Sequence, residues 1–232
     1  MADPIEKFNN IKIHTQYSIC EGAIKIDDLA DYCKNNKIKA IGLSDSNNLC
    51  GALEFSEKIS KVGTQPIIGT QINLLNDNIY GKISLYATTE KGYKNLTKLS
   101  SLSYLKKKDT HEPSCSLDDL IANNEDLILL TGGYNNFFGK LFYANKTKNI
   151  YKIIENLKNI FTNRIYIEIL RHKENQEQNF EKFLLYLSST YELPLIASQE
   201  VYYLEPDMAE AHDALICIGE KQFIDDPNRF RY

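Results

Sequence analysis

The sequence predicts an α/β protein built on a mostly parallel sheet. Seven short apolar segments of strand character alternate with segments whose apolar residues recur at helical spacing. The chain shows no internal repeat and no low-complexity linker, and 232 residues is a common length for one α/β barrel. We therefore expect a single domain over residues 1–232, with polar residues at the carboxyl ends of the strands meeting at one rim.

The first half of the chain repeats a strand and helix unit. A short apolar alternation predicts a strand over 11–14, which delivers His14 to its polar end. Apolar residues three or four positions apart then predict helices, and continuous apolar runs predict buried strands. In order, these are a helix over 26–33, a strand over 40–43, a helix over 52–62, strands over 66–75 and 82–87 joined by Asn76-Asp77-Asn78, and a helix over 93–104.

The second half continues the alternation after a lysine-rich loop, Lys106-Lys107-Lys108-Asp109. The string Ser116-Leu117-Asp118-Asp119 is typical of a capping box that opens a short helix. The remaining patterns predict, in order, a strand over 127–131, a helix over 150–161, a strand over 165–169, a helix over 180–191 and a strand over 194–197. The aromatic residues after the fifth of the seven strands fit either helix packing or an exposed partner-binding patch: Tyr134, Phe137, Phe138, Phe142 and Tyr143.

Composition argues against several classes of protein. A net charge of −4 with 25% charged residues is ordinary for a globular chain and lacks the basic excess of a free-standing nucleic-acid binder, so any contact with DNA is expected to come through a larger assembly. The five cysteines are widely spaced and contain no Cys-x-x-Cys pair, which argues against a disulfide framework or a zinc ribbon. Neither a signal peptide nor a long apolar span is visible, so we expect a cytoplasmic location.

Several strings resemble one family. The strings His14-Thr15-Gln16-Tyr17-Ser18, Gly42-Leu43-Ser44-Asp45-Ser46 and Pro66-Ile67-Ile68-Gly69-Thr70-Gln71 are similar to the polymerase and histidinol phosphatase (PHP) domain. Glu200-Val201-Tyr202-Tyr203-Leu204 and Ala209-Glu210-Ala211-His212-Asp213 look like the PHP domains that open bacterial DNA polymerase III alpha subunits. The resemblance runs from about Phe8 to Tyr232. It implies a distorted, TIM-like (βα)7 barrel and an N-terminal fragment of a longer polymerase chain.

The resemblance also implies a metal site that this sequence has largely lost. Active family members hold two or three zinc or manganese ions through nine ligands, because clustered divalent ions clamp a phosphoryl group and activate water. Matched position by position, the residues that can still ligate are His14, Glu21 and Glu200. The six other positions carry Lys12, Ser46, Gln71, Lys82, Gly133 and Tyr202.

Lys12 and Lys82 give the strongest argument against bound divalent ions. An ammonium about 5 Å from a divalent ion is repelled by roughly 6 kcal/mol at an effective dielectric of about 20. We therefore expect no metal and no catalytic residue in this segment. We expect Lys12 and Lys82 to act as internal cations that neutralise Asp45, Glu21 or Glu200.

The expected role is structural, in DNA replication. The resemblance implies a scaffold for the rest of the polymerase alpha subunit and a docking platform for a separate proofreading exonuclease. Polymerisation, with its magnesium and its DNA, would belong to the parent chain. The alternative is a free-standing metal-dependent phosphoesterase or nuclease with a reduced site of His14, Glu21, Asp45 and Glu200, and a pyrophosphatase attached to the polymerase would need the same metals.

For the other histidines, a structural role is the alternative to a functional one. His172 follows a predicted strand near Glu168 and fits either a general base or a surface turn. His212, beside Asp213 on a helical pattern, fits a packing or capping residue. His111 lies in the lysine-rich loop and carries no functional signal.

Overall fold

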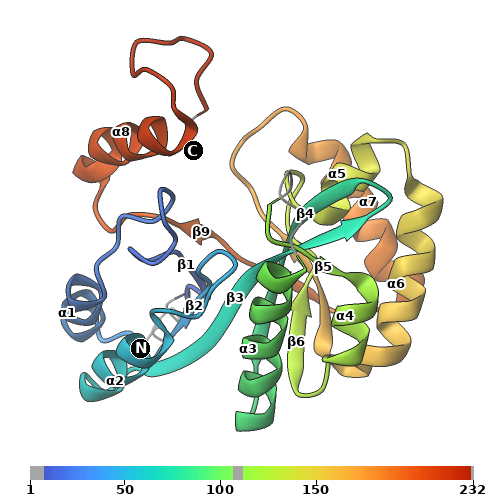
Figure 1. Ribbon diagram of the computed structural model, residues 1–232, viewed down its shortest axis with the longest axis horizontal. Helices are drawn as coiled ribbons and strands as arrows, with labels where there is room; N and C mark the ends of the chain where they lie inside the picture. Colours follow the sequence, from blue (N-terminus) through green and yellow to red (C-terminus); the bar gives the residue numbers. More distant parts are fainter. Residues whose placement is uncertain (1–7, 107–111, 231–232) are drawn as a thin grey trace, which may run out of the picture. The chain divides into compact units, whose positions relative to one another are not determined.

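The computed structural model describes residues 8–106 and 112–230, and Figure 1 shows their helices and strands. The predicted loop residues Lys107, Lys108, Asp109 and His111 lie outside this part, as does the end of the family resemblance at Tyr232. The chain divides into two compact units. Unit 1 comprises Met1–Asp45, Cys50–Ile68 and Glu200–Tyr232, and unit 2 comprises Ser46–Leu49 and Gly69–Gln199.

Unit 1 is built on parallel strands in the order β9, β1, β2, β3. The strands are β1 (Lys12–Ile13), β2 (Ala40–Leu43), the first four residues of β3 (Gln65–Asn76) and β9 (Glu200–Val201). Its helices are α1 (Ile26–Asn36), α2 (Ala52–Lys61) and α8 (Ala209–Glu220), with a 3-10 turn, η2 (Pro206–Met208). Apolar faces at helical spacing bury α1 through Ile26, Leu29 and Cys33.

Unit 2 orders its strands β8, β7, β6, β4, β3, and β5 also pairs with β3. Strand β4 is antiparallel to both β3 and β6, and the other pairs are parallel. The strands are the rest of β3, β4 (Ile79–Ala87), β5 (Cys115–Ser116), β6 (Leu127–Leu130), β7 (Ile165–Ile169) and β8 (Leu195–Ala197). The helices are α3 (Glu90–Leu105), α4 (Leu117–Ala122), α5 (Phe137–Tyr143), α6 (Thr147–Phe161), the 3-10 turn η1 (Thr162–Arg164) and α7 (Glu177–Tyr191).

The seven predicted strands are confirmed as β1, β2, β3, β4, β6, β7 and β8. The capping box is also confirmed, since the Asp119 N–H donates to Ser116 Oγ and the Ser116 N–H donates to the Asp119 carboxylate, each over 3.1 Å. The patterns did not predict β5 and β9, because neither of these two-residue strands lies in an apolar alternation such as Ile11-Lys12-Ile13 at β1. The packing reading is confirmed for Phe137 and Phe138, which are fully buried.

Thr162, at the end of α6, has an unfavourable backbone. Its φ of 52° and ψ of −112° suit glycine, and a β-branched residue there stores strain. We expect Thr162→Gly to raise the free energy of unfolding by about 1 kcal/mol in a urea titration. The matched control is Thr97→Gly, at an exposed position inside α3, where the same change should lower stability by about 0.3–0.5 kcal/mol. A loss of stability in Thr162→Gly would contradict the strain argument.

The cysteines differ sharply in exposure. Burial raises the pKa of the Cys33 thiol to about 11 and that of the Cys115 thiol to about 12, and Cys217 is also buried. Cys50 is exposed and Cys20 is half-buried. We expect a disulfide exchange reagent near about pH 8 to label Cys50 and Cys20 rapidly and the other three only after denaturation, as counted by mass spectrometry. Labelling of Cys33 as fast as Cys50 would contradict this packing.

Candidate functional site

In unit 1, strand β1 and the residue after it carry two positions at which the resemblance implies metal ligands. Lys12 and His14 are two residues apart, and both side chains are fully buried. Strand β9 lies parallel to β1, with Lys12 in register with Glu200. This pairing brings the retained Glu200 beside the position where the family has its first histidine.

Lys12 and Glu200 form an ion pair. The distance from Lys12 Nζ to Glu200 Oε1 is 2.8 Å, and the Glu200 side chain is 14% exposed. Tyr202 donates its hydroxyl to the other Glu200 oxygen over 3.1 Å. The structure thus pairs Lys12 with Glu200, one of the three carboxylates expected as its partner.

His14, the retained histidine, is covered by an aromatic ring. The ring of Tyr202 stacks on it with centroids 4.4 Å apart and planes 16° apart. Its Nδ1 lies 3.3 Å from Ser18 Oγ. The resemblance implies a second histidine at position 202. The tyrosine found there packs against His14, a residue that matches a ligand of the family.

Asp45 is buried and accepts three hydrogen bonds. Its Oδ1 accepts from the Thr15 N–H and the Ser18 hydroxyl, both over 2.7 Å, and its Oδ2 accepts from the Thr15 hydroxyl over 2.8 Å. Burial raises the pKa of the Asp45 carboxyl, the Ser18 and Thr15 hydrogen bonds oppose this, and the charge of Glu21 adds to it. Sequence reasoning did not identify Thr15 and Ser18, although both hydroxyls belong to the string that opens the family resemblance.

The loop after β1 is held by α8. His212 is buried, and its Nε2 lies 2.7 Å from the carbonyl oxygen of Glu21, in agreement with the packing or capping reading. A Cβ at Gly22 would lie 2.2 Å from the Thr15 carbonyl oxygen, so the loop requires glycine here. The retained Glu21 is therefore fixed through its backbone.

In unit 2, three other lost positions lie close together. Ser46 and Gln71 form a parallel bridge, and Lys82 Nζ donates to Ser46 Oγ over 2.8 Å. Gln71 Nε2 lies 3.5 Å from Ser84 Oγ. A hydroxyl, an amide and an ammonium thus hydrogen-bond where the resemblance implies two imidazoles and a carboxylate.

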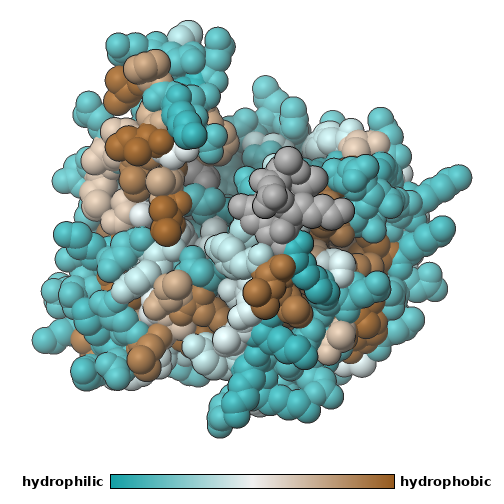
Figure 2. Space-filling view, viewed as in Figure 1, coloured by the Kyte–Doolittle hydropathy of each residue, from teal (hydrophilic) through white to brown (hydrophobic). Residues whose placement is uncertain are grey.

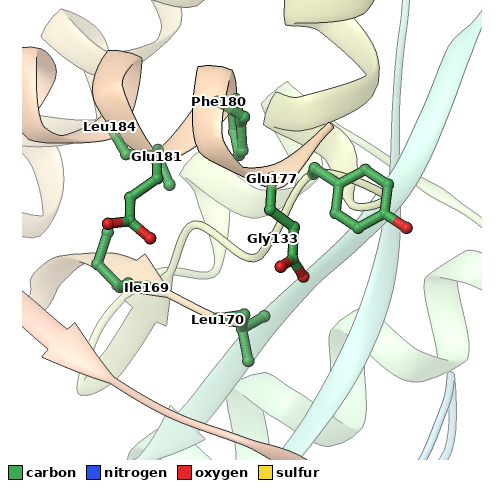
Figure 3. Close-up of a pocket in the computed structure, with 8 residues that line it drawn as sticks. Gly133, Ile169, Leu170, Glu177, Phe180, Glu181 and Leu184 are labelled. Atoms are coloured by element: carbon green, nitrogen blue, oxygen red, sulfur yellow. The ribbon is translucent and has the colours of Figure 1, made fainter. Parts of the chain in front are cut away.

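Gly133, at the remaining one of these positions, lines a small hollow (Figure 3). Two carboxylates from α7 point into the same region, but both already have partners. Glu177 accepts from the His172 N–H over 2.6 Å, and Glu181 accepts two hydrogen bonds from Arg171 over 2.9 and 2.7 Å. The His172 side chain is exposed, in agreement with the surface-turn reading.

The donor set of unit 1 does not fit a cluster of divalent ions. An ammonium and a phenol stand at two of its ligand positions, and the ammonium is bound to the retained Glu200. Within residues 8–106 and 112–230, no three His, Cys, Asp or Glu side chains are grouped closely enough to hold a metal ion. The metal-free state remains a prediction, because only a measurement of bound metal can test it. No helix of the described part is long and apolar enough to cross a membrane.

The chain is similar to known proteins over almost its whole length. The model of the PHP domain family matches residues 10–172. The DNA polymerase III subunit alpha of Caulobacter vibrioides is 34% identical over 234 residues, covering 97% of this chain and 20% of the relative, and that of Vibrio cholerae is 30% identical over 232 residues, covering 99% and 20%. The chain thus spans about a fifth of the length of these curated relatives.

The fold also resembles solved structures. A protein from Bifidobacterium adolescentis, provisionally described as a metal-dependent phosphoesterase, superposes with a TM-score of 0.57 at 11% identity, covering 88% of this chain and 91% of that one. A two-domain protein from Bacteroides vulgatus that contains a predicted PHP-like phosphoesterase gives a TM-score of 0.52 at 10% identity, covering 83% and 51%. At this identity the likeness concerns the fold alone.

Proposed function

Since the chain belongs to the PHP domain family, we propose that it is a catalytically degenerate PHP domain of a replicative DNA polymerase III alpha subunit. Its role would be structural, as a single PHP domain that supports the polymerase body and offers a docking platform for a separate proofreading exonuclease. DNA, and the magnesium of polymerisation, would be bound by the rest of the polymerase. The curated relatives are about five times longer than the matched region, which supports a place within a larger chain.

One observation carries the proposed loss of catalysis. The fully buried Lys12 occupies a ligand position and is paired at 2.8 Å with Glu200, one of the three retained ligands. A divalent ion at this place would have to displace the ammonium from Glu200 and tolerate it nearby. The stacking of Tyr202 on His14 adds a second obstacle, because it packs a phenol ring against the remaining imidazole.

The deciding experiment measures bound metal and hydrolysis on one sample. The purified chain is incubated with zinc and manganese and desalted, and its metal content is measured by elemental analysis alongside phosphodiesterase activity. We expect less than about one ion in ten chains and no metal-dependent hydrolysis. Two or more tightly held ions with hydrolysis would favour the alternative, a phosphoesterase that uses His14, Glu21, Asp45 and Glu200.

A matched variant makes the negative result informative. Lys12→His combined with Tyr202→His places two imidazoles beside His14 and Glu200, which removes the ammonium and supplies four possible ligands in unit 1. We expect this variant to retain about one zinc ion under the conditions in which the natural sequence retains none. Equal metal content in both proteins would contradict the explanation through Lys12 and Tyr202.

A further inference from the structure

Large apolar side chains are unusually exposed at the end of α8. Among the described residues, five large apolar side chains are more than 70% exposed, and three of them lie here: Ile19 at 81%, Ile218 at 72% and Phe223 at 84%. Ile224, beside Phe223, is 45% exposed. We call Ile19, Ile218, Phe223 and Ile224 the α8 apolar surface. Figure 2 shows hydrophobic side chains gathered over α8.

A close contact brings the segments that carry Ile19 and Ile218 together. A Cβ at Gly219 would lie 2.6 Å from the Cβ of Cys20, so the loop carrying Ile19 lies directly against the end of α8. Ile218 and Ile19 are the chain neighbours of the two residues in contact. Phe223 follows the helix end, where Lys221 adopts a left-handed conformation and the Gln222 N–H donates to the Cys217 carbonyl over 2.9 Å. Isolated exposed apolar residues are common, but a group of this kind marks an interaction site.

The α8 apolar surface is also held firmly. Arg229 pairs with Asp213 at 2.6 Å, with the Arg229 side chain only 7% exposed, so the segment after Phe223 is tied back to α8. His212 fixes the other half of the helix to the Glu21 carbonyl. A surface ordered before binding loses little conformational entropy when a partner covers it.

The charges around the surface restrict the partner. Among the described residues from Glu220 to Asp226, Glu220 and Asp225 are exposed and Asp226 is half-buried, against one exposed cation, Lys221. An acidic rim repels nucleic-acid phosphates and favours a protein surface with an apolar centre and lysine or arginine around it.

We propose that the α8 apolar surface is the face on which the rest of the polymerase alpha subunit packs. This inference rests on the proposed function, which places the domain in a chain about five times longer than the matched region. The remaining four fifths of such a chain is the nearest large protein surface available at equal stoichiometry. The partner face carries an apolar pocket for Phe223 and Ile218 and basic residues opposite Glu220 and Asp225.

The test compares carbene labelling of the 232-residue chain with labelling of the full-length subunit. We expect labelling of Phe223 and Ile218 to fall at least about fivefold in the full-length protein. Leu53, on α2 of the same unit and 72% exposed like Ile218, is the matched control and should stay labelled. In the full-length subunit, Ile218→Ser with Phe223→Ser should restore labelling of Ile19 and Ile224, whereas Leu53→Ser should leave it low.

Each other result has a distinct meaning. Equal labelling of Phe223 in both proteins would overturn the assignment of this surface while leaving the metal-free scaffold standing. Protection that appears in the 232-residue chain alone and grows with its concentration would show that a second copy covers the surface, which would also overturn it. A natural reading frame that ends near Tyr232 would instead overturn the proposed function itself.

Discussion

Lys12→Met should lower the free energy of unfolding by about 3 kcal/mol near neutral pH, because it leaves Glu200 without its cation in a largely buried place. Methionine fills a similar volume, so the loss reflects charge more than packing. The measurement is urea unfolding of the natural sequence and the variant under one set of conditions, followed by circular dichroism. Unchanged or improved stability would show that Lys12 does not neutralise Glu200.

Two controls separate the ion pair from other effects. Lys12→Met combined with Glu200→Gln removes both charges and should recover most of the lost stability, because no buried charge is then left alone. Lys94→Met breaks the pair between Lys94 and Glu90, whose side chains are 73% and 82% exposed, and should cost less than about 0.5 kcal/mol. An equal loss in the Lys94 and Lys12 variants would mean that burial of the pair is irrelevant.

Asp45→Ala should lower stability by about 3 kcal/mol. The Thr15 N–H and the hydroxyls of Thr15 and Ser18 would all lose a buried acceptor, and these losses exceed the gain from no longer burying a charge. Asp45→Asn is the matched control, because its amide oxygen can still accept from the Thr15 N–H and Ser18, and it should cost about 1 kcal/mol or less. Equal losses in the two variants would contradict this account.

The difference in stability between the natural sequence and Asp45→Asn should depend on pH. Burial raises the folded pKa of Asp45 above the unfolded value of about 3.9. The stability that this group contributes is therefore complete below about pH 4 and is lost as pH rises through the folded pKa. The advantage of the natural sequence over Asp45→Asn should shrink across that window in paired urea titrations. An advantage that grows with pH would show that the folded pKa is lowered instead.

In unit 1, two residues that differ from the family's ligands contact residues that match them. Lys12 pairs with Glu200, and Tyr202 packs against His14. Former ligands left without ions would be unpaired buried polar groups, which are costly. Lys12 and the Tyr202 hydroxyl are partners for the Glu200 carboxylate, and the Tyr202 ring covers His14.

Periodicity was sufficient to predict most elements, because apolar spacing of two or about 3.6 residues is a local property of strands and helices. It placed the helices α1, α2, α3, α6 and α7 and the strands β1, β2, β3, β4, β6, β7 and β8. It did not find the short strands β5 and β9. It also could not give the antiparallel direction of β4, because strand direction depends on which distant segments hydrogen-bond.

The sequence by itself determined the fold class and the PHP resemblance, and from that resemblance came the expectation that six ligand positions carry other residues. Each depends on which residue types stand at which spacing. Only the tertiary structure decided that Lys12 pairs with Glu200, that Tyr202 stacks on His14 and that Thr15 and Ser18 hold Asp45. It also decided that Ile19 and Phe223, about 200 residues apart in the chain, share the neighbourhood of the contact between Cys20 and Gly219. Such pairs are set by strand register and helix docking between remote segments, and no local pattern encodes them.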